Sequence, residues 1–164
     1  MTDAEIPLFM VRMSPSARDA VERVLMSGHI AQGPIVDQFE RLLDLHLELP
    51  KGRAVTVNSG TAALHLAYVL AGVGRGDIVL ASPMTCAATI TPIVQMGAIP
   101  IWVDVDPLTG NLDPLAIKRT LDFLAHRVTR VHKAIVAVDW AGVPADYHGI
   151  RAYADEHADR RTPI

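Results

Sequence analysis

Hydrophobic residues recur at helical spacing along the first third of the chain. The pattern predicts one amphipathic helix over residues 14–28, with Ser14 as its N-cap and Gly28 as its stop signal. It predicts a second helix over residues 36–49, which ends where a proline and a glycine follow. We therefore expect residues 1–50 to form an N-terminal helical segment.

After residue 50 the pattern changes, and short β-branched runs alternate with segments of helical length. The predicted strands cover residues 53–57, 77–82, 99–105 and 133–138. The predicted helices cover residues 61–74, 85–97, 111–128 and 146–158. Apolar strands that alternate with helices indicate an α/β fold, in which a parallel or mostly parallel sheet carries helices on both faces. We assign residues 51–164 to this unit.

Composition narrows the class of protein. Half of the 164 residues are apolar and a fifth are charged, which is typical of a globular domain. The formal net charge of -3 gives no reason to expect nucleic acid or an anionic membrane as a partner. The N-terminus lacks a basic-then-apolar leader, and no apolar run approaches the ~18 residues of a membrane span. We expect a cytoplasmic protein.

Cysteine and histidine residues do not indicate a metal site. Cys86 is the only cysteine, so the sequence allows neither an intrachain disulfide nor a cysteine-based metal site. The seven histidines are scattered over separate predicted elements, and none of them has ligand spacing with a carboxylate. We therefore expect no bound metal.

The first candidate site lies where the strand predicted at residues 53–57 turns into a helix. The first N–H groups of a helix have no partner within it, and the helix dipole makes that end positive. Gly60 lets the backbone approach a ligand closely, and Thr61 adds a hydroxyl. The segment predicts a phosphate site. The alternative is that Asn58 or Ser59 is only an N-cap and Gly60 only a tight turn.

The segments that follow the other predicted strands also carry polar groups. They are Pro83-Met84-Thr85-Cys86, then Asp104 and Asp106, then Asp139-Trp140. Because ligands of open parallel sheets bind outside the carboxyl ends of the strands, these residues predict a cleft there. Asp104 and Asp106 have the alternative of capping a turn, Cys86 of being a small buried residue and Trp140 of packing. A nicotinamide site is disfavoured because no G-x-G-x-x-G sequence follows the first strand.

Four longer segments carry a family resemblance. They are residues 27–40, 57–67, 76–114 and 133–157, and their order and spacing resemble the DegT/StrS family of pyridoxal phosphate (PLP)-dependent sugar aminotransferases. The resemblance implies part of a fold type I aminotransferase large domain. In the family, more of that domain and a smaller C-terminal domain follow. Members of the family act as dimers with sites at the interface, so it also implies a homodimer or a pairing with a complementary chain.

The resemblance also implies which residues contact the cofactor. The residues that match the family's phosphate-binding segment are Ser59, Gly60, Thr61 and Ala62. Cys86 stands where the family usually has an aromatic ring on the pyridine face, so a thinner, polarisable contact replaces the stacking. Thr89 matches a serine or threonine near the cofactor.

The resemblance implies a substrate as well. The family transfers an amino group from an amino acid such as glutamate to a keto-sugar nucleotide. Asp139 stands where many members carry histidine, and Trp140 follows it, so both are candidates for the substrate side. The products would serve polysaccharide or antibiotic biosynthesis.

Transamination requires a lysine that forms a Schiff base and a carboxylate at the pyridine nitrogen. None of the three lysines, Lys51, Lys118 and Lys133, matches the family position, and the family's aspartate belongs to a later segment. We therefore expect no catalytic residue in this chain, weak or absent PLP binding by the chain alone, and no activity without a partner. Three explanations remain: a fragment of a longer or split reading frame, a half-enzyme completed by a second chain, and a non-catalytic cofactor-binding or dimerisation module.

Overall fold

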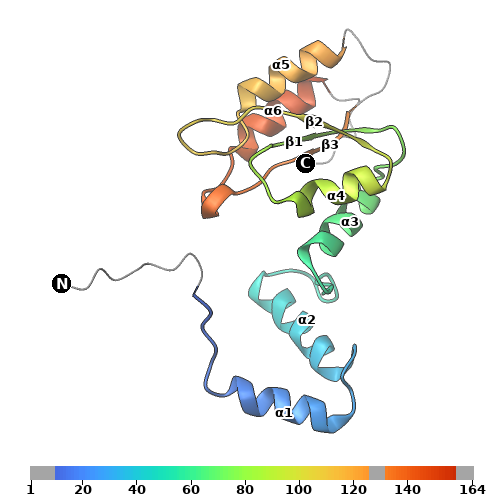
Figure 1. The fold of residues 1–164 in the computed structure, drawn as a ribbon, viewed down its shortest axis with the longest axis vertical. Coiled ribbons are helices and arrows are strands. Elements are labelled where there is room, and N and C mark those ends of the chain that lie inside the picture. The colour runs from blue at the N-terminus through green and yellow to red at the C-terminus, as the bar shows by residue number, and fades with distance from the viewer. Residues whose placement is uncertain (1–9, 126–131, 158–164) are drawn as a thin grey trace, which may run out of the picture. The chain divides into compact units, whose positions relative to one another are not determined.

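The structure is a computed structural model, which describes residues 10–125 and 132–157 (Figure 1). The chain divides into two compact units, Met1–Thr56 and Val57–Ile164. The first unit is helical, and the second is a parallel sheet with helices on both faces.

The first unit contains α1 (Ala17–Ser27) and α2 (Pro34–His46). Gly28 ends α1 in a left-handed conformation, with a φ of 77°, which confirms the predicted stop. The predicted N-cap is wrong, because Ser16 precedes the first helical residue. The Ser14 hydroxyl instead accepts the N–H of Ser16 at 3.3 Å.

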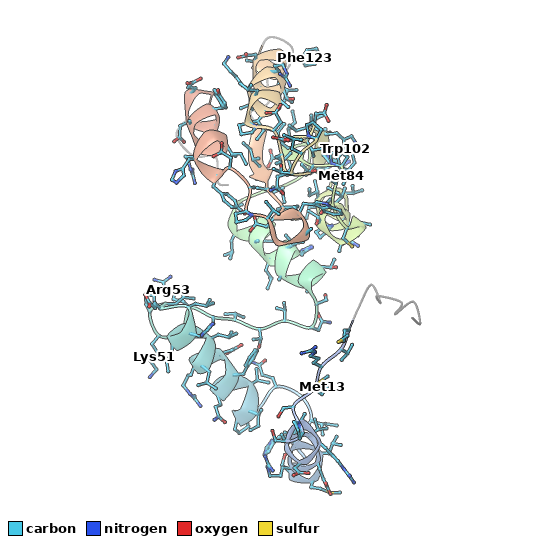
Figure 2. All side chains as sticks on the ribbon, turned by 90° about the vertical axis from the view of Figure 1, so that its left-hand side faces the viewer. Met13, Lys51, Arg53, Met84, Trp102 and Phe123 are labelled. Atoms are coloured by element: carbon cyan, nitrogen blue, oxygen red, sulfur yellow. The ribbon has the colours of Figure 1, made fainter. Side chains whose placement is uncertain are left out.

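The segment after α2 corrects the predicted strand at residues 53–57. It has no strand assignment, and the described strands pair only among themselves. Asp44 of α2, which is 4% exposed, accepts the N–H groups of Gly52, Arg53 and Ala54 at 2.6, 3.1 and 2.7 Å. Glu40 accepts the N–H of Thr56 at 2.8 Å. Carboxylates of a helix therefore occupy amides that a strand would donate to its neighbour. Figure 2 shows Lys51 and Arg53 in this turn.

The described residues of the first unit bury no apolar side chain. Apolar side chains that are more than half exposed occur on both helices, among them Leu25, Phe39, Leu42 and Leu45. Both helices are amphipathic as predicted, but their apolar faces are open. Such contiguous apolar surface is characteristic of an interface.

The sheet of the second unit has three parallel strands, β1 (Ile78–Ala81), β2 (Ile99–Trp102) and β3 (His132–Val136), in the order β2-β1-β3. The connecting helices are α3 (Gly60–Leu70), α4 (Ala87–Gln95), α5 (Pro114–Ala125) and α6 (Tyr147–His157). Figure 1 shows α5 and α6 on one side of the sheet and α3 and α4 on the other. The predicted α/β fold class is confirmed.

Two hydrophobic clusters hold these layers together. Val79 of β1 packs with Tyr68 and Ile93 on the α3 and α4 side. The next residue, Leu80, packs with Ile117 and Ile150 on the α5 and α6 side. Successive strand residues point to opposite faces, so a strand that is covered on both sides must be apolar throughout. This explains why β1 is the most continuously apolar strand.

Pro100 identifies β2 as an edge strand. The N–H of Ile99 donates to Asp77 O at 2.7 Å, and that of Val103 donates to Ala81 O at 3.0 Å. Because N–H groups alternate in direction along a strand, the nitrogen of Pro100 faces away from β1. A proline is tolerated only at that position, where the missing N–H costs no ladder hydrogen bond.

Candidate active site

Ser59 caps α3. Its backbone is extended, and its Oγ accepts the N–H of Ala62 at 3.2 Å. The Ser59 carbonyl accepts the N–H of Ala63 at 3.1 Å. Among the described residues the N–H groups of Gly60 and Thr61 have no acceptor. Ser59, and not Asn58, is thus the N-cap of α3, and the cap leaves two amides available at the positive end of the helix.

Gly60 leaves these amides open. It is the first residue of α3 and does not adopt a left-handed conformation, so the backbone does not require glycine there. A Cβ placed on Gly60 would meet no atom within 4 Å. The absence of a side chain therefore keeps the two amides accessible to a ligand and is not required by the geometry of the turn. With the Thr61 hydroxyl beside them, these amides fit the donor set that a phosphate group needs.

The N-terminus of α3 lies toward the carboxyl ends of the strands. Helix α4 connects two parallel strands, so it begins at the carboxyl end of β1. Helix α3 ends in a turn that leads into the amino end of β1, so its own N-terminus points the same way as that of α4. The two helices pack side by side (Figure 1). The Tyr68 hydroxyl joins them by donating to Thr89 O at 2.9 Å.

Cys86 precedes α4 and is exposed, so the alternative of a small buried residue is wrong. It lines an open cavity of about 500 Å³ together with Ile90, Val94 and Trp102. Residues 59–62 do not line this cavity. Cys86 therefore presents its thiol at the start of α4, beside an apolar surface.

Thr89 is 7% exposed, and its hydroxyl lies 2.8 Å from the hydroxyl of Thr85. Either hydroxyl can be the donor, so the pair retains one further proton or lone pair for a ligand. The structure thus places Thr89 one turn into α4, behind Thr85. Thr85, which is partly exposed, was predicted to lie at the cleft but not to contact the cofactor.

Asp139 and Trp140 lie in the loop that leaves β3. One carboxylate oxygen of Asp139 accepts the N–H of Ala145 and the hydroxyl of Tyr147, both at 2.9 Å. Burial, together with the hydrogen bond to Asp139, raises the pKa of Tyr147. The Trp140 side chain is 39% exposed. The loop therefore presents one oxygen of Asp139 and part of an indole ring.

Asp104 and Asp106 shape the loop between β2 and α5. Asp104 accepts the N–H of Val105 at 2.9 Å, and Asp106 accepts that of Leu108 at 2.7 Å. Each of the two carboxylates therefore accepts a backbone N–H of its own loop, as the alternative of turn capping expects. They do not supply carboxylates to a shared site through those oxygens.

Asp44 and Asn111 are among the buried polar residues that sequence reasoning missed. Asp44 interrupts the leucine-rich face of α2, and an acid at an apolar position, ahead of a proline and a glycine, was the signal available. Asn111 lies in a turn sequence, where an asparagine is ordinary. Only the fold shows that it is 3% exposed.

No cluster of three or more metal-ligating side chains occurs in the described ranges, residues 10–125 and 132–157. Over the same ranges, the helices are too short or too polar to cross a membrane.

The chain is similar in structure to part of known sugar aminotransferases. Sugar aminotransferase CalS13 from Micromonospora echinospora is 40% identical with a TM-score of 0.81, and the match covers 98% of this chain and 42% of that one. Spr1654 from Streptococcus pneumoniae, in its PLP form, is 30% identical with a TM-score of 0.81, and the match covers 97% and 38%. The model of the DegT/DnrJ/EryC1/StrS aminotransferase family matches residues 12–158. The chain belongs to that family, as its sequence predicted.

The chain is also similar in sequence to two curated proteins. The spore coat polysaccharide biosynthesis protein SpsC of Bacillus subtilis is 38% identical over 137 residues, which cover 84% of this chain and 33% of the relative. The L-glutamine:2-deoxy-scyllo-inosose aminotransferase of Streptoalloteichus tenebrarius is 39% identical over 146 residues, with coverage of 86% and 33%. The chain spans about one third of the length of these relatives.

Proposed function

We propose that this chain supplies the phosphate-binding part and one wall of the substrate site of a PLP-dependent aminotransferase. The substrate is a keto-sugar nucleotide, and an amino acid such as glutamate is the amino donor. The observation that carries the proposal is the pair of amides of Gly60 and Thr61, which have no acceptor among the described residues and lie under an open surface. Family membership and the relatives' names support the reaction class.

The residues present fit the cofactor's phosphate and one ring face. In the proposal the phosphate accepts hydrogen bonds from the amides of Gly60 and Thr61 and from the Thr61 hydroxyl. The exposed Cys86 thiol provides a polarisable contact to the ring. The hydroxyl pair of Thr85 and Thr89 supplies a further polar group. Bound PLP supplies an electron sink for the reaction.

The lysines support the proposal that the chain does not transaminate alone. Lys118 Nζ donates to Asp122 at 2.8 Å, and this hydrogen bond, with the charge of Asp122, raises the pKa of Lys118. A protonated amine that is held by a carboxylate is a poor nucleophile. Lys51 lies in the turn after α2, within the first unit. We propose that the catalytic lysine comes from residues outside this sequence or from a second chain.

The open apolar surface of the first unit supports a partner. Helices α1 and α2 line a cavity of about 590 Å³, whose walls include Val24, Ile30 and Ile35. Exposed apolar surface of this kind is stable in water only when another chain or segment covers it. We propose that a second copy or a complementary chain covers it in the cytoplasm. A non-catalytic dimerisation module is the second candidate function that this surface favours.

A PLP titration tests the phosphate site. We expect Gly60→Ala to weaken PLP binding about tenfold, because a methyl group over the amides displaces the anion. Gly74→Ala is the matched control, since a Cβ there meets only Asp77 Oδ2 at 3.8 Å and the residue is remote in sequence from the cap. Equal affinities of Gly60→Ala and the wild type, measured by equilibrium dialysis, would contradict the proposal.

The same titration tests the role of the lysines. We expect bound PLP to keep the absorbance of the free aldehyde. The visible absorbance of a lysine-bound cofactor in the isolated chain would contradict the proposal that no competent lysine is present.

A further inference from the structure

The loop that leaves β3 is fastened by one side chain from the loop that leaves β2. Asn111 Nδ2 donates to Val143 O at 2.9 Å and to Pro144 O at 3.2 Å. Its Oδ1 accepts the N–H of Trp140 at 2.8 Å. Both donors and the acceptor of this 3% exposed amide are therefore used, and all of them bind the backbone of residues 140–144.

Gly110, the residue before Asn111, supports the indole of Trp140. A Cβ on Gly110 would lie 2.7 Å from Trp140 Cδ1 and 3.3 Å from Cγ. The φ of Gly110 is also 73°, which side chains with a Cβ rarely adopt. The ring thus packs directly on backbone, and only glycine permits that approach.

The turn that carries Asn111 is itself fixed. The N–H of Asp106 donates to Asn111 O at 2.9 Å, and the N–H of Gly110 donates to Asp106 O at 2.8 Å. The N–H of Asn111 donates to the Thr109 hydroxyl at 3.2 Å. The Asn111 side chain therefore projects from a rigid base.

The fastened loop contains a strained residue. Ala141 has a φ of 53° and a ψ of 25°, which is a left-handed conformation that is unfavourable for a residue with a Cβ. The bonds of Asn111 lie on both sides of it, at Trp140 before and at Val143 and Pro144 after. Such strain persists only where surrounding contacts hold the backbone in its conformation. The hydrogen bonds of Asn111 hold it here.

We propose that Asn111 is a positioning residue, which sets the orientation of the Trp140 indole and of Asp139 at the carboxyl end of β3, with Gly110 as the surface on which the indole rests. The inference rests on the proposed function, in which these two side chains form a wall of the substrate site. A partly exposed indole face and a free carboxylate oxygen suit a hydroxylated sugar ring, whose C–H face packs on aromatics and whose hydroxyls donate to carboxylates.

The test uses Trp140 as its own reporter. In a Trp102→Phe background, Trp140 is the single tryptophan of the chain. PLP absorbs at the emission wavelengths of tryptophan, so bound PLP quenches an indole that is near and suitably oriented. Asn111→Asp keeps the acceptor for Trp140 N–H and places a carboxylate oxygen against the carbonyls of Val143 and Pro144. We expect the quenching by saturating PLP to fall at least about twofold while PLP affinity stays within about twofold, the scale of a perturbation without direct contact.

Gln38→Glu is the control, since it makes the same amide-to-acid change at an exposed position of α2, in the first unit. Unchanged quenching in Asn111→Asp would overturn the positioning role. If PLP binds to the wild type without quenching Trp140, this inference fails and the proposed function stands. If dialysis finds no PLP binding, the proposed function fails.

A double-mutant cycle decides the role of Gly110 and Trp140 independently of PLP. Gly110→Ala adds both backbone strain and a clash with the ring, whereas in a Trp140→Ala background only the strain remains. The quantity compared is the factor by which Gly110→Ala raises the unfolding equilibrium constant. We expect this factor to be at least tenfold larger in the wild type than in the Trp140→Ala background. Equal effects in the two backgrounds would show that the ring does not rest on Gly110.

Discussion

The Tyr68 hydroxyl of α3 donates a hydrogen bond of 2.9 Å to the backbone carbonyl of Thr89 in α4. It joins the two helices whose N-termini carry the proposed cofactor contacts. We expect Tyr68→Phe to lower the free energy of unfolding by about 1 kcal/mol, the usual contribution of a buried hydrogen bond between uncharged groups. Urea denaturation followed by circular dichroism measures this difference.

Tyr147→Phe is the matched control for that substitution. It removes a phenol that bonds to Asp139 at 2.9 Å, but Tyr147 lies on α6 and outside the contact of α3 with α4. Only Tyr68→Phe should increase the separation of α3 from α4, which amide exchange in the first turn of α4 would reveal. Equal exchange in both variants would contradict the joining role of Tyr68.

The Tyr68 phenol also makes the stability of the protein decrease at alkaline pH. Burial raises the pKa of Tyr68 to about 12 from an ordinary value of 10.0. Its contribution is complete below the unfolded pKa and is lost as the pH rises through the folded pKa. We therefore expect the free energy of unfolding to fall between about pH 10 and pH 12, and to fall less steeply in Tyr68→Phe. Parallel slopes for the two proteins would contradict this assignment.

Asp44 has the opposite effect in the first unit, where its contribution to stability is lost in acid. Hydrogen bonds from the N–H groups of Ala54 and Gly52 hold its pKa below the ordinary value. A carboxyl with a lowered folded pKa stabilises the structure above its unfolded pKa, and that stabilisation is lost as the pH falls through the folded pKa. We expect the protection of the amides of residues 52–54, relative to their intrinsic exchange rates at the same pH, to decrease in acid. In Asp44→Asn this protection should be low at every pH.

Asp37→Asn controls for the loss of charge on α2, because Asp37 is exposed and lies in the first turn of the helix. Protection of residues 52–54 should persist in this variant. Fast exchange in Asp37→Asn would show that the charge of the helix, rather than the Asp44 hydrogen bonds, holds the turn.

The sequence predicted the sheet because a covered strand must be apolar on both faces, and β1 satisfies this condition along its whole length. The β-branched run at residues 53–57 has the same local signal, yet a strand requires a neighbour that accepts its hydrogen bonds. Asp44 and Glu40 fill that role here, and periodicity does not show such a contact between distant residues. Local propensity therefore predicted a strand at residues 53–57, where the structure has none.

The sequence also predicted only part of the candidate site. A serine followed by glycine and a helical pattern predicts the cap at Ser59, because capping involves only neighbours in sequence. The roles of Asn111 and Gly110 depend on Trp140, some thirty residues later, and only the fold brings them together. Asn111 lies in a turn sequence where an asparagine is ordinary, so the sequence did not show that it holds the loop after β3.

Ser59 and Thr61 should separate helix capping from phosphate binding. Ser59→Ala removes the bond to Ala62 N–H, so we expect a loss of about 1 kcal/mol in the free energy of unfolding. It also frees a third amide for an anion, so the affinity for inorganic phosphate, relative to folded protein, should not fall. Thr61→Val is nearly isosteric and lacks the hydroxyl, so stability should change little while phosphate affinity falls severalfold.

Thermal unfolding and calorimetric phosphate titration of the two variants provide this comparison. We expect Ser59→Ala to have the larger effect on stability and Thr61→Val the larger effect on phosphate affinity. This result would indicate that the first turn of α3 holds the anion. If Thr61→Val binds phosphate as the wild type does and Ser59→Ala does not, then the Ser59 hydroxyl, and not the open amides, holds the anion. In that case the Ser59 hydroxyl would accept the N–H of Ala62 and donate its own proton to the anion, because a hydroxyl can do both at once.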